Sequence, residues 1–313
     1  MALMNGREAH MSRIAAFLAM LGLATTAQAA ELKDICGDCR FEKFSTCNEF
    51  LEGINFDKQG HGWAVGLMTG AIVEVTPDGK CSVRAKTGGK PNGARFHADG
   101  RLFVTDQQRG VLTYDPRTNA IAVFADKIDG KPMINANDLV FDDKGGLYVT
   151  VPGTSSYLDR TGQFVYFAPG STTAQVLVDK LPYPNGVALA PGGQFVNIGL
   201  YGDKTIINIP AVTNPSKARG AYAAVRTEGG IGPDGMTMDS DGRLYWANFF
   251  SGAVGVADTR GFVIGYMKLP DEAGRFTTNL AFHGGYIYVT EAQRGEIWRV
   301  RVTTKGQALY YQP

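Results

Sequence analysis

The stretch PDGMTMDSDGRLYWAN, residues 233–248, contains the pattern that decides the fold. It has a polar residue near its head, an alternating apolar run, a turn rich in Gly and Asp, and a second run rich in aromatic and β-branched residues. That order is typical of a β-hairpin. Close variants of it occur at residues 52–65, 91–106, 136–150, 184–198 and 278–291. One structural unit is therefore repeated along almost the whole chain.

The spacing of the repeats predicts a propeller. Their polar heads are Glu52, Asn92, Asn137, Asn185, Asp234 and Asn279. Successive heads are 40 to 49 residues apart, and a period of about 40–50 residues with about four strands per unit is typical of a propeller blade. We therefore predict an all-β, six-bladed β-propeller with four antiparallel strands per blade around a central channel. It forms a single domain over residues 52–313.

The first residues have the pattern of a signal peptide, which we assign to residues 1–29. Two arginines precede or begin the apolar run 14–23, and the AQA of residues 27–29 fits a cleavage site. The apolar run is short for a bilayer span, although a membrane anchor is the alternative. We predict a mature protein that begins near Ala30, is exported to the periplasm or secreted, and has no membrane association after leader removal.

All four cysteines, Cys36, Cys39, Cys47 and Cys81, fall in the first part of the mature chain. In an exported protein an even number favours disulfides, for which three pairings exist. The Cys-x-x-Cys spacing at 36–39 also suits zinc or redox chemistry, but the other two cysteines are not spaced as the second pair that zinc normally needs. We predict structural bridges that hold the N-terminal segment, residues 30–51, to the first blade.

Charge and strand patterns add three further expectations. The formal net charge is +1 with both signs mixed along the chain, so a nucleic-acid partner is not expected. In the last blade the outer strands are expected at 296–302 and 308–312. Blade three contains a long connection at 151–162, and long loops on a rigid scaffold are where binding residues concentrate.

The polar heads are expected to form a ring at one mouth of the channel. The inner strand of each blade starts at that face, whereas the tips of the hairpins point to the other. Carboxylate and amide oxygens with no thiolate or imidazole among them favour a hard cation such as Ca²⁺. Glu52 and Asp234 would balance a divalent charge. Singly, each Asn-Gly or Asp-Gly is better explained as an ordinary turn, but six polar heads in register at one mouth favour the cation site. We expect Asn92 and Asn279 to be structural.

Histidine-based catalysis is not expected at this ring. His10 lies in the predicted leader, and His61, His97 and His283 lie at or beside hairpin tips on the opposite face. A Ser-His-Asp arrangement therefore cannot be assembled among the heads. Chemistry there would depend on a metal and a carboxylate.

The repeats contain EG at 52–53, ND at 137–138, PNG at 184–186, PDG at 233–235 and the D-x-D-G-x-L-Y-x-A form at 239–247. With these motifs, the sequence from about residue 50 to its end resembles the calcium-dependent six-bladed propellers of the senescence marker protein, gluconolactonase and luciferin-regenerating enzyme family. The resemblance implies that Glu52, Asn185 and Asp234 bind Ca²⁺, or another divalent cation such as Zn²⁺ or Mn²⁺. Asn137 would complete the site or hold a substrate oxygen or water.

The same resemblance implies hydrolysis of a lactone. The cation would polarise the carbonyl group, and Asp234 would be the general base. Sugar-lactone hydrolases of this family usually carry an Arg two residues before the ND motif, where this chain has Asn135. The residues that we expect to contact the substrate are Asn135, Asn137, Tyr157, Tyr201, Phe249 and Phe250. This aromatic rim favours a small, fairly apolar lactone or ester, unless its phenylalanines only pack between blades.

Two other classes of function remain open at this point. One is a metal-free condensing or small-molecule-binding propeller, similar to the strictosidine-synthase-like proteins, in which an acidic residue transfers protons without a cation. The other is a structural propeller that binds a partner on its rim. The pair Glu52 and Asp234 argues against both, because two buried carboxylates without a cation are destabilising. The same site would also suit phosphotriester hydrolysis.

Overall fold

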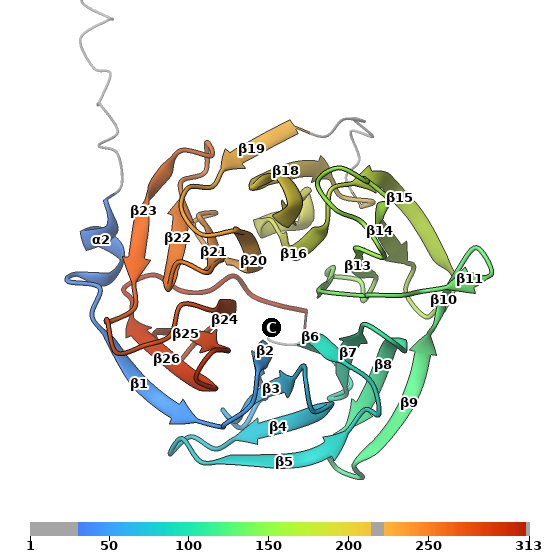
Figure 1. Ribbon diagram of the computed structural model, residues 1–313, viewed down its shortest axis with the longest axis horizontal. Coiled ribbons are helices and arrows are strands. Elements are labelled where there is room, and N and C mark those ends of the chain that lie inside the picture. The colour runs from blue at the N-terminus through green and yellow to red at the C-terminus, as the bar shows by residue number, and fades with distance from the viewer. Residues whose placement is uncertain (1–30, 214–221, 311–313) are drawn as a thin grey trace, which may run out of the picture. The chain divides into compact units, whose positions relative to one another are not determined.

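The structure, a computed structural model, describes residues 31–213 and 222–310. Within them, six four-stranded antiparallel sheets surround a central channel (Figure 1). The prediction of an all-β, six-bladed propeller is therefore confirmed. The predicted signal peptide lies in residues 1–30, outside the described residues. No helix among the described residues is long and apolar enough to cross a bilayer.

The first three blades follow the order of the sequence. Blade one consists of β2 (Leu51–Phe56), β3 (Gly62–Gly66), β4 (Ala71–Val75) and β5 (Cys81–Lys86). Blade two consists of β6 (Pro91–Phe96), β7 (Leu102–Asp106), β8 (Gly110–Asp115) and β9 (Ala120–Ala125). A two-stranded ribbon, β10 (Lys127–Ile128) with β11 (Lys131–Pro132), precedes blade three. Blade three consists of β12 (Leu139–Phe141), β13 (Leu147–Val151), β14 (Gly162–Phe167) and β15 (Ala174–Leu181).

The last three blades complete the ring. Blade four consists of β16 (Pro184–Leu189), β17 (Phe195–Leu200), β18 (Thr205–Pro210) and β19 (Tyr222–Arg226), with the short 3-10 turns η2 (Pro191–Gly193) and η3 (Tyr201–Asp203). Blade five consists of β20 (Gly232–Met238), β21 (Leu244–Phe249), β22 (Ala253–Ala257) and β23 (Val263–Lys268). Blade six contains β24 (Thr277–His283), β25 (Tyr286–Glu291) and β26 (Glu296–Arg301). Inner strands such as β2 and β16 are buried at every residue, because neighbouring blades cover both of their faces.

The ring is closed by a strand from the N-terminal segment. β1 (Phe41–Thr46) pairs antiparallel with β26 and is the outer strand of blade six. The prediction of an outer strand at 308–312 is wrong for its described part, since residues 308–310 form no strand. A disulfide joins Cys47, directly after β1, to Cys81 on β5 of blade one, so the predicted link between this segment and the first blade is present. A second disulfide, Cys36–Cys39, lies at the end of the short helix α2 (Leu32–Cys36). Both of its cysteines belong to the N-terminal segment, so the prediction that the bridges hold this segment to the first blade is wrong for this one.

A local break in the strand register shapes the head of most inner strands. In blades one, two, four, five and six, the pairing of the first and second strands shifts at the polar head, which is the mark of a β-bulge. The glycine after the head lies against the next blade. At Gly93 a Cβ would lie 2.8 Å from the carbonyl oxygen of Asn137, and at Gly186 it would overlap the carbonyl oxygen of Asp234. The head-Gly pairs therefore let successive blades approach closely around the channel.

The segment after β26 crosses the opposite mouth of the channel (Figure 1). It is held there by backbone hydrogen bonds from Gln307 to Met238 O at 3.0 Å and from Ser240 to Lys305 O at 2.9 Å. Residues 307–310 line one cavity at this mouth, and residues 304–307 with 309 line a second. This C-terminal segment therefore covers the side of the channel where the hairpin tips lie.

Candidate active site and metal centre

Three acidic side chains from three blades lie within electrostatic reach of one another at the mouth formed by the repeat heads. Glu52 on β2, Asp138 directly before β12 and Asp234 on β20 are all almost fully buried. Their charges act on one another, since Asp234 and Asp138 both raise the pKa of Glu52, and Asp138 raises that of Asp234. The structure therefore brings Glu52 and Asp234 together and places a third carboxyl group beside them.

Burial is the main reason why these carboxyl groups resist ionisation. It raises the pKa of Glu52 and of Asp234 well above the ordinary carboxyl range, and repulsion between the groups raises both further. Burial also raises the pKa of Asp138, although the Arg95 guanidinium and two backbone N–H groups oppose that rise. As anions, the three groups are destabilising unless a positive charge lies among them.

Acceptor oxygens without a hydrogen-bond partner also lie among the repeat heads. Within the described residues, no hydrogen bond reaches the buried atoms Glu52 Oε2, Asn137 Oδ1 and Asn185 Oδ1. The Asn185 side chain hydrogen-bonds to the Asp234 carboxylate. A buried acceptor is normally paired, because leaving it unpaired is destabilising. Carboxylate and amide oxygens are the ligands that Ca²⁺ prefers, so the residues present fit a bound divalent cation.

The predicted ligands are of mixed type. No group of three or more His, Cys, Asp or Glu side chains among the described residues is arranged to hold a metal ion. The predicted set Glu52, Asn137, Asn185 and Asp234 is of another kind, since half of it is amide. Asn279, by contrast, uses its side-chain oxygen to accept the backbone N–H of Leu280 at 2.9 Å. Its oxygen is therefore already occupied, as expected of a structural head.

An arc of aromatic rings begins beside the acidic groups. Burial, together with the charges of Asp234 and Glu52, raises the pKa of the Tyr183 and Tyr201 hydroxyl groups, which places both tyrosines near the carboxylates. The arc continues by ring contacts through Tyr183, Tyr201, Phe249, Phe276 and Phe50, with successive centroids 5.1 to 6.4 Å apart. Two of the predicted contact residues, Tyr201 and Phe249, therefore belong to one continuous apolar wall.

Three positions near this arc have a left-handed backbone that is uncommon outside glycine. Phe250 has φ 69° and stacks on Phe276 with centroids 5.3 Å apart. Asn135 has φ 57° and Tyr183 has φ 52°. The Asn135 amide donates to Gly153 O at 3.0 Å and to the Tyr183 hydroxyl at 3.5 Å. Such conformations persist where the surrounding structure enforces them, and they cluster at functional sites.

Tyr157, another of the predicted contact residues, and the two acids Asp106 and Glu291 have different surroundings. Tyr157 is 58% exposed, and its aromatic ring lies under the Arg160 guanidinium, 5.7 Å from its centroid. No ring contact among the described residues joins it to the aromatic arc. The carboxyl groups of Asp106 and Glu291 are buried, and each accepts three backbone N–H bonds from neighbouring loops. These two acids therefore hold loop structure together and are satisfied without a ligand.

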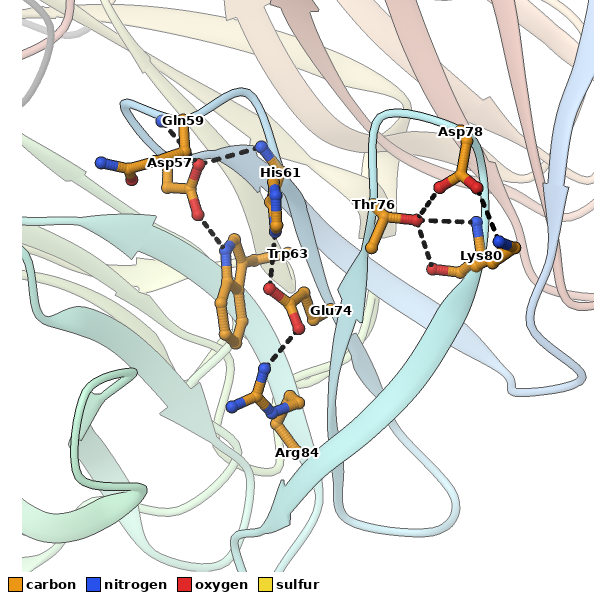
Figure 2. A network of polar contacts seen from close by, with 9 residues as sticks. All are labelled: Asp57, Gln59, His61, Trp63, Glu74, Thr76, Asp78, Lys80 and Arg84. Atoms are coloured by element: carbon orange, nitrogen blue, oxygen red, sulfur yellow. Dashed lines mark hydrogen bonds and ion pairs between the residues drawn. The ribbon is translucent and has the colours of Figure 1, made fainter.

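The three histidines among the described residues, His61, His97 and His283, lie at or beside the hairpin tips, as predicted, and His10 lies outside the described residues. Figure 2 shows His61, whose Nδ1 lies 2.6 Å from Glu74 Oε1, while Arg84 holds the other oxygen of the same carboxylate. The adjacent Asp57 accepts the Trp63 Nε1–H at 2.9 Å. All of these groups belong to blade one at the mouth opposite the acidic site. They form a structural network rather than a catalytic one.

Asp138 is the acidic residue that sequence reasoning did not assign. Its oxygens accept the backbone N–H groups of Leu139 at 2.9 Å and Val187 at 3.1 Å, so it also connects blades three and four. The signal was present in the repeat itself. Four heads are followed by glycine, whereas Asn137 is followed by an acid. A charged side chain at the point where four other copies have the smallest residue marks a position inside the channel.

Comparison with known proteins shows which proteins this chain resembles. The sequence profile of the SMP-30/Gluconolactonase/LRE-like region matches residues 50–293. The lactonase drp35 of Staphylococcus aureus (strain MRSA252) is 29% identical over 230 residues, which cover 70% of each chain. A gluconolactonase structure from Xanthomonas campestris is similar with a TM-score of 0.76 at 19% identity, covering 87% of this chain and 92% of that one.

The calcium-binding protein regucalcin from Agrobacterium tumefaciens str. C58 is also similar, with a TM-score of 0.72 at 20% identity over 86% of this chain and 95% of its own. At such identities the two structural likenesses show the fold. The profile match shows the family as well, because it spans most of the chain and contains all the heads from Glu52 to Asn279. The chain belongs to the SMP-30/gluconolactonase/LRE-like family.

Proposed function

We propose that the protein is a divalent-metal-dependent lactonase that acts on a small, fairly apolar lactone or ester, with Ca²⁺ as the preferred ion. The family and the lactonase relatives support hydrolysis of a small molecule. The observation that carries the metal dependence is the set of unpartnered, buried acceptor oxygens on Glu52, Asn137 and Asn185. These oxygens, with the Asp234 carboxylate, would hold the ion.

Each residue of the site has a distinct part in this proposal. When bound, the ion supplies a Lewis acid that polarises the carbonyl group of the substrate. Asp234 accepts a proton from the attacking water, and the Asn185 amide orients its carboxylate through their hydrogen bond. Asn137 either completes the ligand set or orients a substrate oxygen. Asp138 holds blades three and four in place through its backbone hydrogen bonds.

The aromatic arc supports an apolar substrate. Tyr201 and Phe249 form a continuous wall next to the carboxylates, and the exposed Phe250 extends it. Asn135 stands where a sugar-lactone hydrolase would have arginine, and its amide is already used by Gly153 and Tyr183. The site therefore offers stacking surface where a sugar lactone would need hydrogen bonds to its hydroxyl groups.

A paired substrate assay tests this function. We expect kcat/KM for a benzo-fused δ-lactone to exceed that for an aldono-δ-lactone of the same ring size by about tenfold or more, since loss of matched apolar contact changes selectivity by that order. Chelator should remove both activities, and added Ca²⁺ should restore them. Full activity in chelator, with no stoichiometric ion in the purified protein, would instead favour the metal-free condensing or binding propeller.

We also propose that the protein is exported, to the periplasm or outside the cell. The two disulfides, Cys36–Cys39 and Cys47–Cys81, suit an oxidising compartment. They also suit the signal-peptide pattern of residues 1–29. Mass spectrometry of the protein purified from its native cell should find a chain that begins near Ala30 with all four cysteines oxidised. An intact N-terminus with reduced cysteines would contradict export.

A further inference from the structure

An arginine side chain lies buried among the inner strands of the propeller. Arg95 on β6 is 6% exposed, and each of its three side-chain nitrogens donates to a backbone carbonyl of a different blade. Nε donates to Leu139 O at 3.3 Å, Nη1 to Ile54 O at 3.4 Å and Nη2 to Met236 O at 3.3 Å. One guanidinium group therefore connects blades one, two, three and five.

The strands that Arg95 holds are those that carry the acidic side chains. β2 carries Glu52, β12 directly follows Asp138, and β20 carries Asp234. Each contacted carbonyl belongs to a residue one or two positions after one of these acids. The planar fork of arginine suits such a three-way contact, because its N–H groups point in fixed directions that a lysine cannot reproduce. The positions of the three carboxylates are therefore tied to one cation.

The charges of the group lead to a specific expectation. Three ionised carboxylates and one guanidinium sum to −2, which a divalent cation neutralises. Without the guanidinium the same carboxylates sum to −3, which a trivalent cation would neutralise. Arg95 also lines both cavities at the second mouth, so it lies between the acidic site and the covered end of the channel.

We propose that Arg95 is the positioning residue of the acidic site, and that its charge makes the site select divalent over trivalent cations. This inference rests on the proposed function, because it concerns the cation that the site holds. A purely structural role in joining the blades would affect stability but would leave the relative affinity for ions of different charge unchanged.

The test measures the affinities of the purified, metal-free protein for Ca²⁺ and Tb³⁺ by calorimetry. Arg95→Gln removes the charge and keeps a donor for the carbonyl groups, whereas Arg95→Lys keeps the charge and loses the fork. The matched control is Arg101→Gln, which removes a positive charge from the same blade at the hairpin tip, where Arg101 pairs with Asp99 at 2.7 Å.

We expect Arg95→Gln to raise the ratio of Tb³⁺ to Ca²⁺ affinity by about tenfold or more, as for unit charges within about 10 Å at an effective dielectric constant near 20. Arg95→Lys and Arg101→Gln should keep the wild-type ratio. An unchanged ratio in a folded Arg95→Gln protein would overturn the inference while leaving the metal site intact. Wild-type protein that binds neither ion would overturn the proposed function itself, and the inference with it.

A second pair of variants covers the case in which Arg95→Gln does not fold. Asp138→Asn removes one negative charge and should lower the Tb³⁺ to Ca²⁺ ratio. The double variant Arg95→Gln/Asp138→Asn restores the net charge of −2 and should return the ratio to its wild-type value. Failure of Asp138→Asn to lower the ratio would contradict the charge argument without any need for the Arg95 variant.

Discussion

Replacing Asp234 with asparagine should lower kcat for lactone hydrolysis by about 10³-fold and make the metal-free protein more stable. The loss of activity follows because the side chain would lose both its charge and its capacity to accept a proton. The gain in stability follows because burial and the neighbouring Asp138 raise the pKa of Asp234 in the folded protein. Asparagine has nearly the same shape and no charge to desolvate, so the two effects should appear in one variant.

The stability gain should depend on pH in a defined direction. A carboxyl group whose pKa is raised by folding contributes its full stability below the pKa of the unfolded chain, near 4, and loses it as pH rises through the folded pKa. Calorimetry in chelator from pH 4 to pH 8 should therefore show little difference in Tm near pH 4. As pH rises, the Tm of the variant should come to exceed that of the wild-type protein. The difference should be roughly 3–5 °C for each unit by which folding raises the pKa of Asp234. Equal Tm values for the variant and the wild-type protein at pH 8 would contradict the conclusion that the buried Asp234 carboxylate destabilises the metal-free protein.

Asp106→Asn is the matched control, because Asp106 is a fully buried carboxylate that already has its partners. It accepts backbone N–H groups of Lys90 at 3.0 Å and Gln108 at 2.9 Å, and the Thr87 hydroxyl at 2.8 Å. Its replacement should lower Tm, since hydrogen bonds to a charged group contribute about 1.5–3 kcal/mol. It should leave kcat nearly unchanged. Changes in Tm of opposite sign for Asp234→Asn and Asp106→Asn would distinguish a ligand-binding carboxylate from a structural one.

Replacing Gly186 with alanine should lower Tm on the order of 10 °C and weaken Ca²⁺ binding. A Cβ at Gly186 would overlap the carbonyl oxygen of Asp234 and lie 2.9 Å from Met236 Cγ. Because the overlap is with backbone, the inner strands of blades four and five must move apart, and overpacking of this kind destabilises by about 3 kcal/mol or more. The backbone that moves is that of Asp234. Thermal unfolding and calcium titration of one variant therefore report both effects.

Gly199→Ala is the control for this substitution. Gly199 lies on β17 of the same blade and faces the same neighbour, but a Cβ there would meet its nearest atoms at an ordinary 3.5 Å. It should change Tm by no more than a few degrees and leave calcium affinity unaltered. If both glycines tolerate alanine equally, the close approach of blades at the repeat heads is not what holds the site together.

The repeat predicted the fold and the place of the site for one physical reason. Each head, such as Glu52 or Asp234, occupies the same position in a hairpin unit, and equivalent positions of a closed ring must meet around its axis. The unit itself could be read because its alternating apolar runs and Asp-Gly turns are local features of the sequence. The prediction that the histidines lie at the other mouth follows from the same geometry and is also confirmed.

Features that depend on contacts between distant residues could not be read in this way. The order β1-β26-β25-β24 joins the two ends of the chain, and the edge of a single strand such as β1 carries no sequence signal for its partner. The role of Arg95 depends on three carbonyl groups in three other blades, and backbone carbonyls are the same in every residue. Asp138 was within reach, but only by asking why the repeat at Asn137 has an acid where four of the other repeats have glycine.

The closure of blade six has a consequence for how the protein is made. Lys43 on β1 pairs with Glu296 on β26 at 2.6 Å, across 253 residues of sequence. At about 5–20 residues per second, the ribosome needs roughly 13 to 50 s between them. During that interval β1 has an exposed edge and no partner strand. A nascent chain that still lacks β26 therefore cannot complete blade six. Folding is therefore finished only after synthesis, and a factor that shields one open strand edge should raise the yield of active protein more than one that speeds up the early blades.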